Sequence, residues 1–346
     1  MRFSWKMVAA TLMLLFVAAV GFSAGQGEDE SGELVFGYVT PGPDTWYRRN
    51  VDGFVHAAEM MGIETVVLNS EYDAGQEVSN IDSLITQGVD GMAIFSFNPQ
   101  GAIVAAERAQ EAGIPLVTID NVGQVLQPEH SNLDAVAAVD FDWEQMGYMY
   151  ADYMAENYPG ARVAVIAGLL EHRPVQIINE AMSTRMQELG QNEIVEIRDG
   201  EYNPIVAVDQ AQDLIQSGLE FDIIWIMNED MAAAVIRYLE GDDLLDDYTV
   251  IAQNGSPAGI ELVNQGKLDY TLSSSPGWEG MVGAFALYDY VSGNTTEMNQ
   301  QIMLPVTEVT EDTIDDPMQV VPWEVDPVWN ELTEEYFPEY ASYLSQ

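Results

Sequence analysis

Short apolar runs alternate with amphipathic helical patterns along most of this chain, and this alternation constrains the fold more than any other feature. The strand-like runs fall into two successive sets, 34–40, 63–68, 91–97 and 115–120, then 162–168, 193–198, 222–227, 248–254 and 269–274. Helical patterns fill the gaps, at 46–61, 75–88, 101–113, 143–157, 176–190, 204–218, 229–240, 256–266 and 277–293. Strands that are apolar on both faces belong to parallel sheets covered by helices on both sides. Two sets of about five strands predict two Rossmann-like, doubly wound α/β lobes.

Many of the predicted helices end at a glycine, which suits the left-handed residue that commonly stops a helix. These glycines are Gly62, Gly88, Gly113, Gly190, Gly218, Gly241 and Gly266. Beyond about residue 310 the alternation ends, and the chain becomes rich in Pro, Asp, Glu and aromatic residues. We interpret 310–346 as a packed C-terminal extension without an assigned role.

The first 25 residues have the architecture of a signal peptide. Arg2 and Lys6 form a basic region, residues 8–20 are almost wholly apolar, and small residues follow at 23–25. An uncleaved membrane anchor is the alternative, but the apolar run is shorter than the roughly 20 residues of a spanning helix. Residues 26–33 predict an acidic, disordered lead-in. Because the chain has no cysteine, a lipid-modified N-terminal cysteine is excluded. We therefore expect an exported protein, cleaved near residue 25 and free in the periplasm.

The chain is strongly acidic, with 57 Asp and Glu residues against 11 Lys and Arg and a formal net charge of −46. Such a surface repels nucleic-acid phosphates, so we expect no nucleic-acid partner. Self-repulsion should lower stability at low salt, and we infer a salty external medium. The alternative is an acidic surface that serves solubility.

Signatures of catalysis are missing. His56, His130 and His172 are isolated and lie in no metal-binding spacing. No GxGxxG follows the first strand, no GxxxxGK[ST] occurs, and Ser256 lacks the GxSxG elbow. We therefore predict a binding protein rather than an enzyme, with no metal and no cofactor. A secreted glycoside-processing enzyme is the alternative from another class, without positive support.

Side chains at the carboxyl ends of the strands are the place where an open α/β sheet binds its ligand. Here they are of two chemical types, flat aromatic rings and acid or amide groups. Rings cover the apolar C–H faces of a sugar and polar groups bond its hydroxyls, so the set predicts a neutral monosaccharide or polyol. The candidates are Asp44, Trp46, Tyr47, Asp120 and Asn121 from the first set of strands, and Arg173, Tyr202, Asn228, Asn254 and Ser274 from the second.

Other interpretations stay open for several of these positions. Asp44 and the nearby acid of the second set, Asp230, are equally well placed to cap helices. Trp46 is suited to ordinary packing between the lobes. Arg173 is at least as well suited to an exposed surface.

A resemblance to one family rests on five stretches of the sequence taken together. These stretches are DTWYRRNVDGF, NIDSLITQGVDGMAIF, AGIPLVTIDN, FDIIWIMNEDMAAAVI and NGSPAGIELVNQGKLDYTLSSSP. Over about 34–310 the chain resembles the periplasmic sugar-binding proteins of the ribose/galactose type, relatives of the effector domains of lactose-repressor-like regulators. The resemblance implies two lobes that close by hinge motion over an enclosed sugar, joined by three crossings near 139–142, 274–276 and 304–306. It implies an N-terminal lobe of 34–139 plus 276–304 and a C-terminal lobe of 140–275 plus 305–346.

The resemblance also implies roles for individual residues. Trp46 and Tyr47 match paired aromatics, and Asp120 matches a carboxylate that bonds ring hydroxyls. Tyr202 matches an aromatic residue of the second lobe. Asn228 matches the asparagine of an NDxMA-like segment, and Ser274 matches a polar residue on the hinge side. Ribose binders have arginines where this chain has Asn121 and Ile178, and an aspartate is common where it has Asn254. Losing two fork-shaped donors argues against ribose as the ligand.

The resemblance implies a monomer that hands its sugar to an ABC-type permease. The alternative is a sensory protein that presents the sugar to a chemoreceptor or kinase ectodomain. The DNA-reading part of the repressor relatives is absent, because a signal peptide and not a helix-turn-helix precedes residue 34.

Overall fold

The computed structural model describes residues 34–96, 98–120 and 123–345. The predicted signal peptide and acidic lead-in lie outside the described residues, and so does the candidate Asn121. Within the described ranges, no helix is long and apolar enough to cross a membrane.

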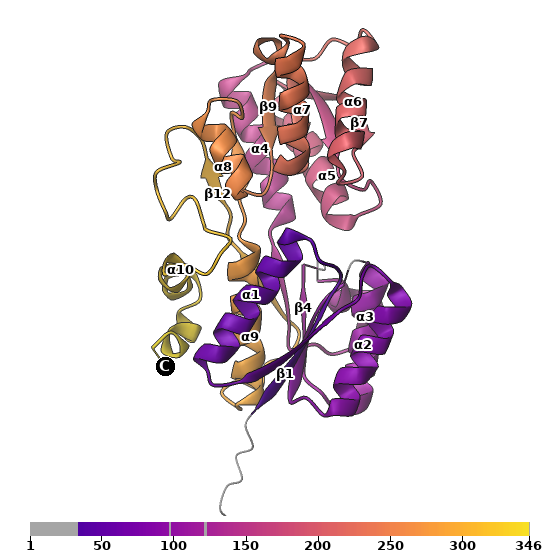
Figure 1. The fold of residues 1–346 in the computed structure, drawn as a ribbon, viewed down its shortest axis with the longest axis vertical. Helices are drawn as coiled ribbons and strands as arrows, with labels where there is room; N and C mark the ends of the chain where they lie inside the picture. Colours follow the sequence, from indigo (N-terminus) through magenta and orange to yellow (C-terminus); the bar gives the residue numbers. More distant parts are fainter. Residues whose placement is uncertain (1–33, 97, 121–122, 346) are drawn as a thin grey trace, which may run out of the picture. The chain divides into compact units, whose positions relative to one another are not determined.

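A six-stranded parallel sheet forms the first lobe, which we call the N-terminal lobe, with strand order β11-β5-β4-β3-β1-β2. Phe36 and Tyr38 of β1 share a core with α1 and α9, whereas Val39 shares a second core with α2 and α3. Figure 1 shows these helix pairs on opposite faces of the sheet. The elements are β1 (Val35–Thr40), α1 (Thr45–Met60), β2 (Glu64–Asn69), α2 (Ala74–Gln87), β3 (Gly91–Phe95), α3 (Pro99–Ala112), β4 (Leu116–Ile119), β5 (Ala137–Phe141), α9 (Pro276–Val291) and β11 (Gln300–Leu304).

A four-stranded parallel sheet with order β7-β6-β8-β9 forms the second lobe, the C-terminal lobe. An antiparallel pair, β10 with β12, continues it through parallel bridges from Ile251 to Tyr270 and from Asn254 to Ser273. The elements are α4 (Trp143–Asn157), β6 (Arg162–Ala167), α5 (Arg173–Leu189), β7 (Glu193–Asp199), α6 (Pro204–Gln216), β8 (Ile223–Ile226), α7 (Glu229–Gly241), β9 (Thr249–Ala252), α8 (Pro257–Asn264), β10 (Thr271–Ser273) and β12 (Thr307–Val309). Short 3₁₀ turns lie at Gln124–Leu126, Pro128–His130 and Leu245–Asp247.

The predicted fold class, two doubly wound α/β lobes, is confirmed, and every predicted strand run overlaps an observed strand. The pattern does not predict β5, which is rich in alanine, or β11 and β12, which are short and begin with polar residues. The helix stop predicted at Gly241 is wrong. Helix α7 includes that glycine, and the left-handed residue beyond it is Asp243, with φ of 56°.

The C-terminal extension does not stay with the C-terminal lobe, contrary to the predicted lobe boundaries. Its helix α10 (Val328–Tyr336) and the 3₁₀ segment Pro338–Tyr343 pack on α9 of the N-terminal lobe. The indole Nε1 of Trp278 donates to Thr333 Oγ1 at 3.0 Å, and the Trp278 and Phe337 rings lie 5.7 Å apart. The physical reason is that α9 is apolar all round, with every residue from 276 to 287 buried, so it needs cover on the side away from its sheet.

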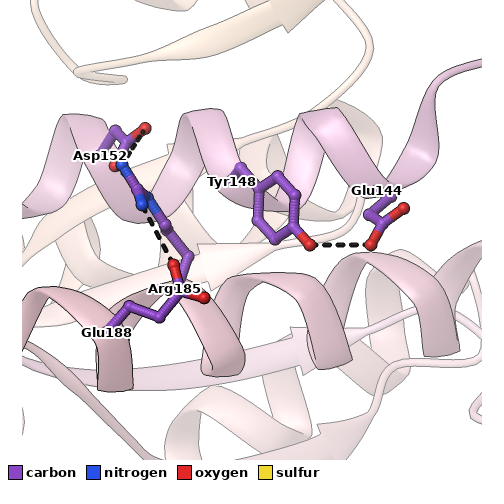
Figure 2. Close-up of polar contacts among 5 residues, drawn as sticks. All are labelled: Glu144, Tyr148, Asp152, Arg185 and Glu188. Atoms are coloured by element: carbon purple, nitrogen blue, oxygen red, sulfur yellow. Dashed lines mark hydrogen bonds and ion pairs between the residues drawn. The ribbon is translucent and has the colours of Figure 1, made fainter.

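Helices α4 and α5 of the C-terminal lobe pack side by side (Figure 2). Arg185 of α5 joins them, since its Nε lies 2.7 Å from Asp152 Oδ1 of α4; within α5, its Nη1 lies 3.1 Å from Glu188 Oε2. Further along α4, the Tyr148 hydroxyl donates to Glu144 at 2.7 Å. These contacts are exposed, so solvent screens them and each contributes little to stability.

The acidic surface gives a first prediction about stability. With a net charge of −46, we expect the melting temperature to rise by at least about 5 °C between low salt and roughly 1 M NaCl, because salt screens the repulsion among carboxylates. Calorimetric melts at increasing NaCl measure this, with sucrose as a control that excludes volume without screening charge. A melting temperature that stays flat or falls would contradict it.

Candidate functional site

The N-terminal lobe gathers three candidates at the carboxyl ends of β1 and β4. Trp46, in the first turn of α1, makes a hydrogen bond to the Asp120 carboxylate, and its ring centroid lies 6.0 Å from that of Phe141. Tyr47 packs edge-on against Phe95, with ring centroids 4.8 Å apart. Asp120 follows β4 in a left-handed conformation, with φ of 52°. A strained non-glycine residue at a strand end is typical of a functional site.

Asp120 is 9% exposed, and its carboxyl group is only partly hydrogen-bonded. Its Oδ1 atom has no hydrogen-bond partner among the described residues. Burial raises the pKa of Asp120 well above its ordinary value, the charge of Asp140 raises it further, and the Trp46 bond lowers it in part. A buried acceptor without a donor is unfavourable unless a ligand supplies one, so Asp120 is suited to accept a hydroxyl.

A buried polar chain lies behind Asp120 that the sequence analysis missed. The Tyr38 hydroxyl donates to Asn50 Oδ1 at 2.6 Å, and Asn50 Nδ2 donates to Glu279 Oε2 at 2.7 Å. Burial raises the pKa of Glu279, and so do the charges of Asp120 and Asp140. The only sequence signal was the acid Glu279 within the otherwise apolar stretch 276–287. In the described part of the chain, no three His, Cys, Asp or Glu side chains are grouped to hold a metal ion.

The C-terminal lobe brings Tyr202 to the same place. Burial raises the pKa of its phenol, and Tyr47 and Asp120 of the other lobe lie close enough to raise it further. The hydroxyl is 2.9 Å from Nδ1 of His172, whose pKa burial lowers to about 4, so the imidazole is neutral at neutral pH. Trp46, Tyr47, Asp120 and Tyr202 therefore lie together, although they come from separate segments and from both lobes.

A cavity of about 240 Å³ is lined by Trp323, whose ring meets that of Trp46, and we call it the Trp323 cavity. Two candidates line it, Asn228 and Asn254, together with residues of α1 and of the C-terminal extension. Asn228 Oδ1 caps α7 by accepting from Met231 N at 2.9 Å, so its amide nitrogen is the group that remains for a ligand. The lining is Thr45, Arg49, Asn228, Glu229, Asp230, Asn254, Ser256, Pro257, Ala258, Trp323 and Glu324.

The remaining candidates lie elsewhere. Arg173 is exposed and lines a second cavity, of about 700 Å³, with Asp140, Phe141 and residues of α4 and α5. Ser274 is fully buried, and its hydroxyl donates to Asn254 O at 3.3 Å rather than facing either cavity. Asp44 is exposed at the start of α1, where it makes no capping bond and accepts a bond from the Tyr72 hydroxyl.

Comparison with known proteins identifies this arrangement. The sequence profile of the periplasmic binding protein domain matches residues 36–295. The chain belongs to the periplasmic binding protein family. It is 23% identical over 233 residues to the ribose import binding protein RbsB of Escherichia coli, which covers 67% of this chain and 76% of that protein. It is 22% identical over 313 residues to the fructose import binding protein FruE of Bifidobacterium longum, which covers 86% of this chain and 93% of that protein.

Among solved structures, this periplasmic binding protein is similar to an ABC transporter solute-binding protein of Bacillus halodurans with bound myo-inositol. The TM-score is 0.73 at 22% identity, covering 83% of this chain and 98% of that one. The resemblance to the family, predicted from five stretches of sequence, is confirmed. These relatives are binding proteins of importers and not enzymes, in agreement with the sequence analysis.

Glu229 gives a pH-dependent prediction for the binding protein. Its Oε1 accepts from Gly255 N at 2.6 Å and Thr271 Oγ1 at 2.7 Å, while burial raises its pKa to about 7. The folded state thus holds this proton more tightly than the unfolded state, so the group's contribution to stability falls as pH rises from about 4.5 to 7. Relative to wild type, Glu229→Gln should gain about 1–3 kcal/mol over that window.

Urea unfolding at pH 5, 6, 7 and 8 measures this gain. The matched control is Asp230→Asn, which removes an exposed acid from the next position. A wild-type-to-variant difference that does not change with pH would contradict the assignment of the titrating proton to Glu229.

Proposed function

We propose that this protein is the solute-binding component of an ABC importer and captures an uncharged monosaccharide or cyclic polyol between its lobes. The observation that carries the proposal is the meeting of Trp46, Tyr47 and Tyr202 around the buried carboxyl group of Asp120. Relatives that bind ribose and fructose for import, and a structural neighbour that holds myo-inositol, support the ligand class.

The charges around the site favour an uncharged ligand. Asp120 and Asp140 would repel an anionic sugar, and Arg49 at the Trp323 cavity is already paired with Asp52 and Glu324. Ribose itself is disfavoured, because Ile178, where ribose binders have an arginine, is a buried core residue of α5. Asp120 Oδ1 and the amide of Asn228 are suited to hydroxyl groups.

Capture proceeds by hinge closure in this proposal. The two bodies are 34–139 with 276–304 and 140–275 with 305–309, and a ligand that bonds both stabilises the closed form by its differential affinity. The permease then recognises the closed monomer. The chain works in the periplasm, after cleavage near residue 25 and without a lipid anchor, since it contains no cysteine.

Isothermal titration calorimetry tests the proposal with D-ribose, D-arabinose, D-allose, D-galactose, D-fructose and myo-inositol, and with D-glucuronate as the charged control. We expect at least one neutral compound to bind with a Kd of about 1 μM or lower, and glucuronate to bind far more weakly. Binding of glucuronate alone, or of none of the neutral compounds, would count against the proposed function.

A further inference from the structure

The C-terminal extension makes a connection between the lobes that lies beyond the family match, which ends at residue 295. Strand β12 pairs with β10 in the C-terminal lobe, and α10 then packs on α9 of the N-terminal lobe. Residues 310–327 therefore pass from one lobe to the other (Figure 1). They add a fourth crossing to the three near 142, 275 and 305.

Hydrogen bonds join this fourth crossing to residues 273–275. Val321 N donates to Ser273 Oγ at 3.0 Å, and Ser275 Oγ donates to Pro322 O at 2.6 Å. The indole of Trp329 donates to the same Pro322 carbonyl at 2.9 Å. Three hydrogen bonds at buried or half-buried positions fix the backbone of 321–322, and they thereby position the next residue, Trp323.

Trp323 reaches the candidate site. Its ring meets that of Trp46 edge-on, with centroids 5.3 Å apart, and it lines the Trp323 cavity with Asn228 and Asn254. The side chain is 6% exposed, yet its Nε1 donor has no hydrogen-bond partner among the described residues. The neighbouring Glu324 pairs with Arg49 of α1 at 2.5 Å, which holds the segment against the cavity.

We propose that Trp323 is a ligand-binding residue supplied by the C-terminal extension, and that its indole N–H donates to a hydroxyl oxygen of the captured sugar or polyol. A buried donor beside a polar cavity is unfavourable without an acceptor, and a ligand oxygen is the acceptor that this cavity can receive. The Trp323 ring also packs against the Trp46 ring, so it limits how closely the face of a sugar can approach Trp46. The inference rests on the proposed function and names a specificity residue for the same site.

The test compares Trp323→Phe, which keeps a ring but removes the N–H, with Phe337→Leu, a control on the same extension that packs against Trp278. Calorimetry uses the neutral compound of the panel that binds wild type most tightly. We expect Trp323→Phe to weaken its binding about 5- to 20-fold, the loss for one buried hydrogen bond. Phe337→Leu should lower the melting temperature and leave the Kd unchanged.

Monodeoxy analogues of that compound separate direct bonding from a structural effect. The analogue that lacks the hydroxyl bonded by Trp323 should bind wild type and Trp323→Phe with equal affinity. The deoxygenation and the substitution each remove one end of the same hydrogen bond. If wild type binds a neutral compound and Trp323→Phe binds it within twofold of wild type, the Trp323 inference is overturned while the proposed function stands. If wild type binds no neutral compound, both are overturned.

Discussion

Asp120→Asn is expected to weaken ligand binding by about 100-fold, the largest effect of any single polar substitution in the site. The substitution keeps the shape of the side chain but replaces one acceptor oxygen of a buried carboxyl group with an amide donor. A ligand hydroxyl that donates to Asp120 Oδ1 would then face another donor. Calorimetry with the neutral compound that binds wild type measures the change.

The stability of Asp120→Asn, unlike its affinity for the ligand, should not fall below that of wild type. Burial and the charge of Asp140 raise the pKa of Asp120, so its ionised form destabilises the folded protein at neutral pH. Removing that charge should leave Asp120→Asn at least as stable as wild type in thermal melts. Asp209→Asn, on the exposed surface of α6, controls for the loss of one negative charge. Unchanged affinity in Asp120→Asn would remove Asp120 from the site.

Gly53→Ala is expected to destabilise the fold by about 3 kcal/mol or more. A Cβ at Gly53 would lie 1.8 Å from the carbonyl oxygen of Gly277, so α1 and α9 touch backbone to backbone. An alanine would push these helices apart, although it is otherwise the better helix former. The same helices carry Asn50 and Glu279, so their separation would also disturb the polar chain behind Asp120.

Gly241→Ala is the matched control, because a Cβ there meets nothing within 4 Å and the backbone needs no left-handed conformation. It should be neutral, or stabilising by up to about 1 kcal/mol. Urea unfolding of both variants measures the free energies. Similar values for the two would show that the α1–α9 contact tolerates a methyl group.

The regular elements could be predicted from the sequence because their signals are local. The sequence pattern predicts helix α4 at its observed bounds, and α6 and α7 nearly so, since apolar spacing and capping residues act within one turn. Strand β5 had no such signal, because Ala137 and Ala138 have little preference for strands and only pairing with β4 and β11 defines them.

The candidate site was predictable in part for a related reason. The rule that ligands lie beyond strand ends located Trp46, Asp120 and Tyr202, because each lies between the end of a strand and the first turn of the next helix. It could not distinguish Ser274, which the fold turns inward to the Asn254 carbonyl. The sequence could not assign Trp323 to the candidate site. More than 270 residues separate it from Trp46, and only tertiary packing on α9 brings the two together.

A crystal structure of the protein with its tightest-binding neutral compound tests the central claim most directly. We expect the compound enclosed between the lobes, with a ring face against Trp46, Tyr47 or Tyr202 and a hydroxyl within hydrogen-bond distance of Asp120 Oδ1. A compound bound outside the lobes, or one that touches none of these four residues, would contradict the account.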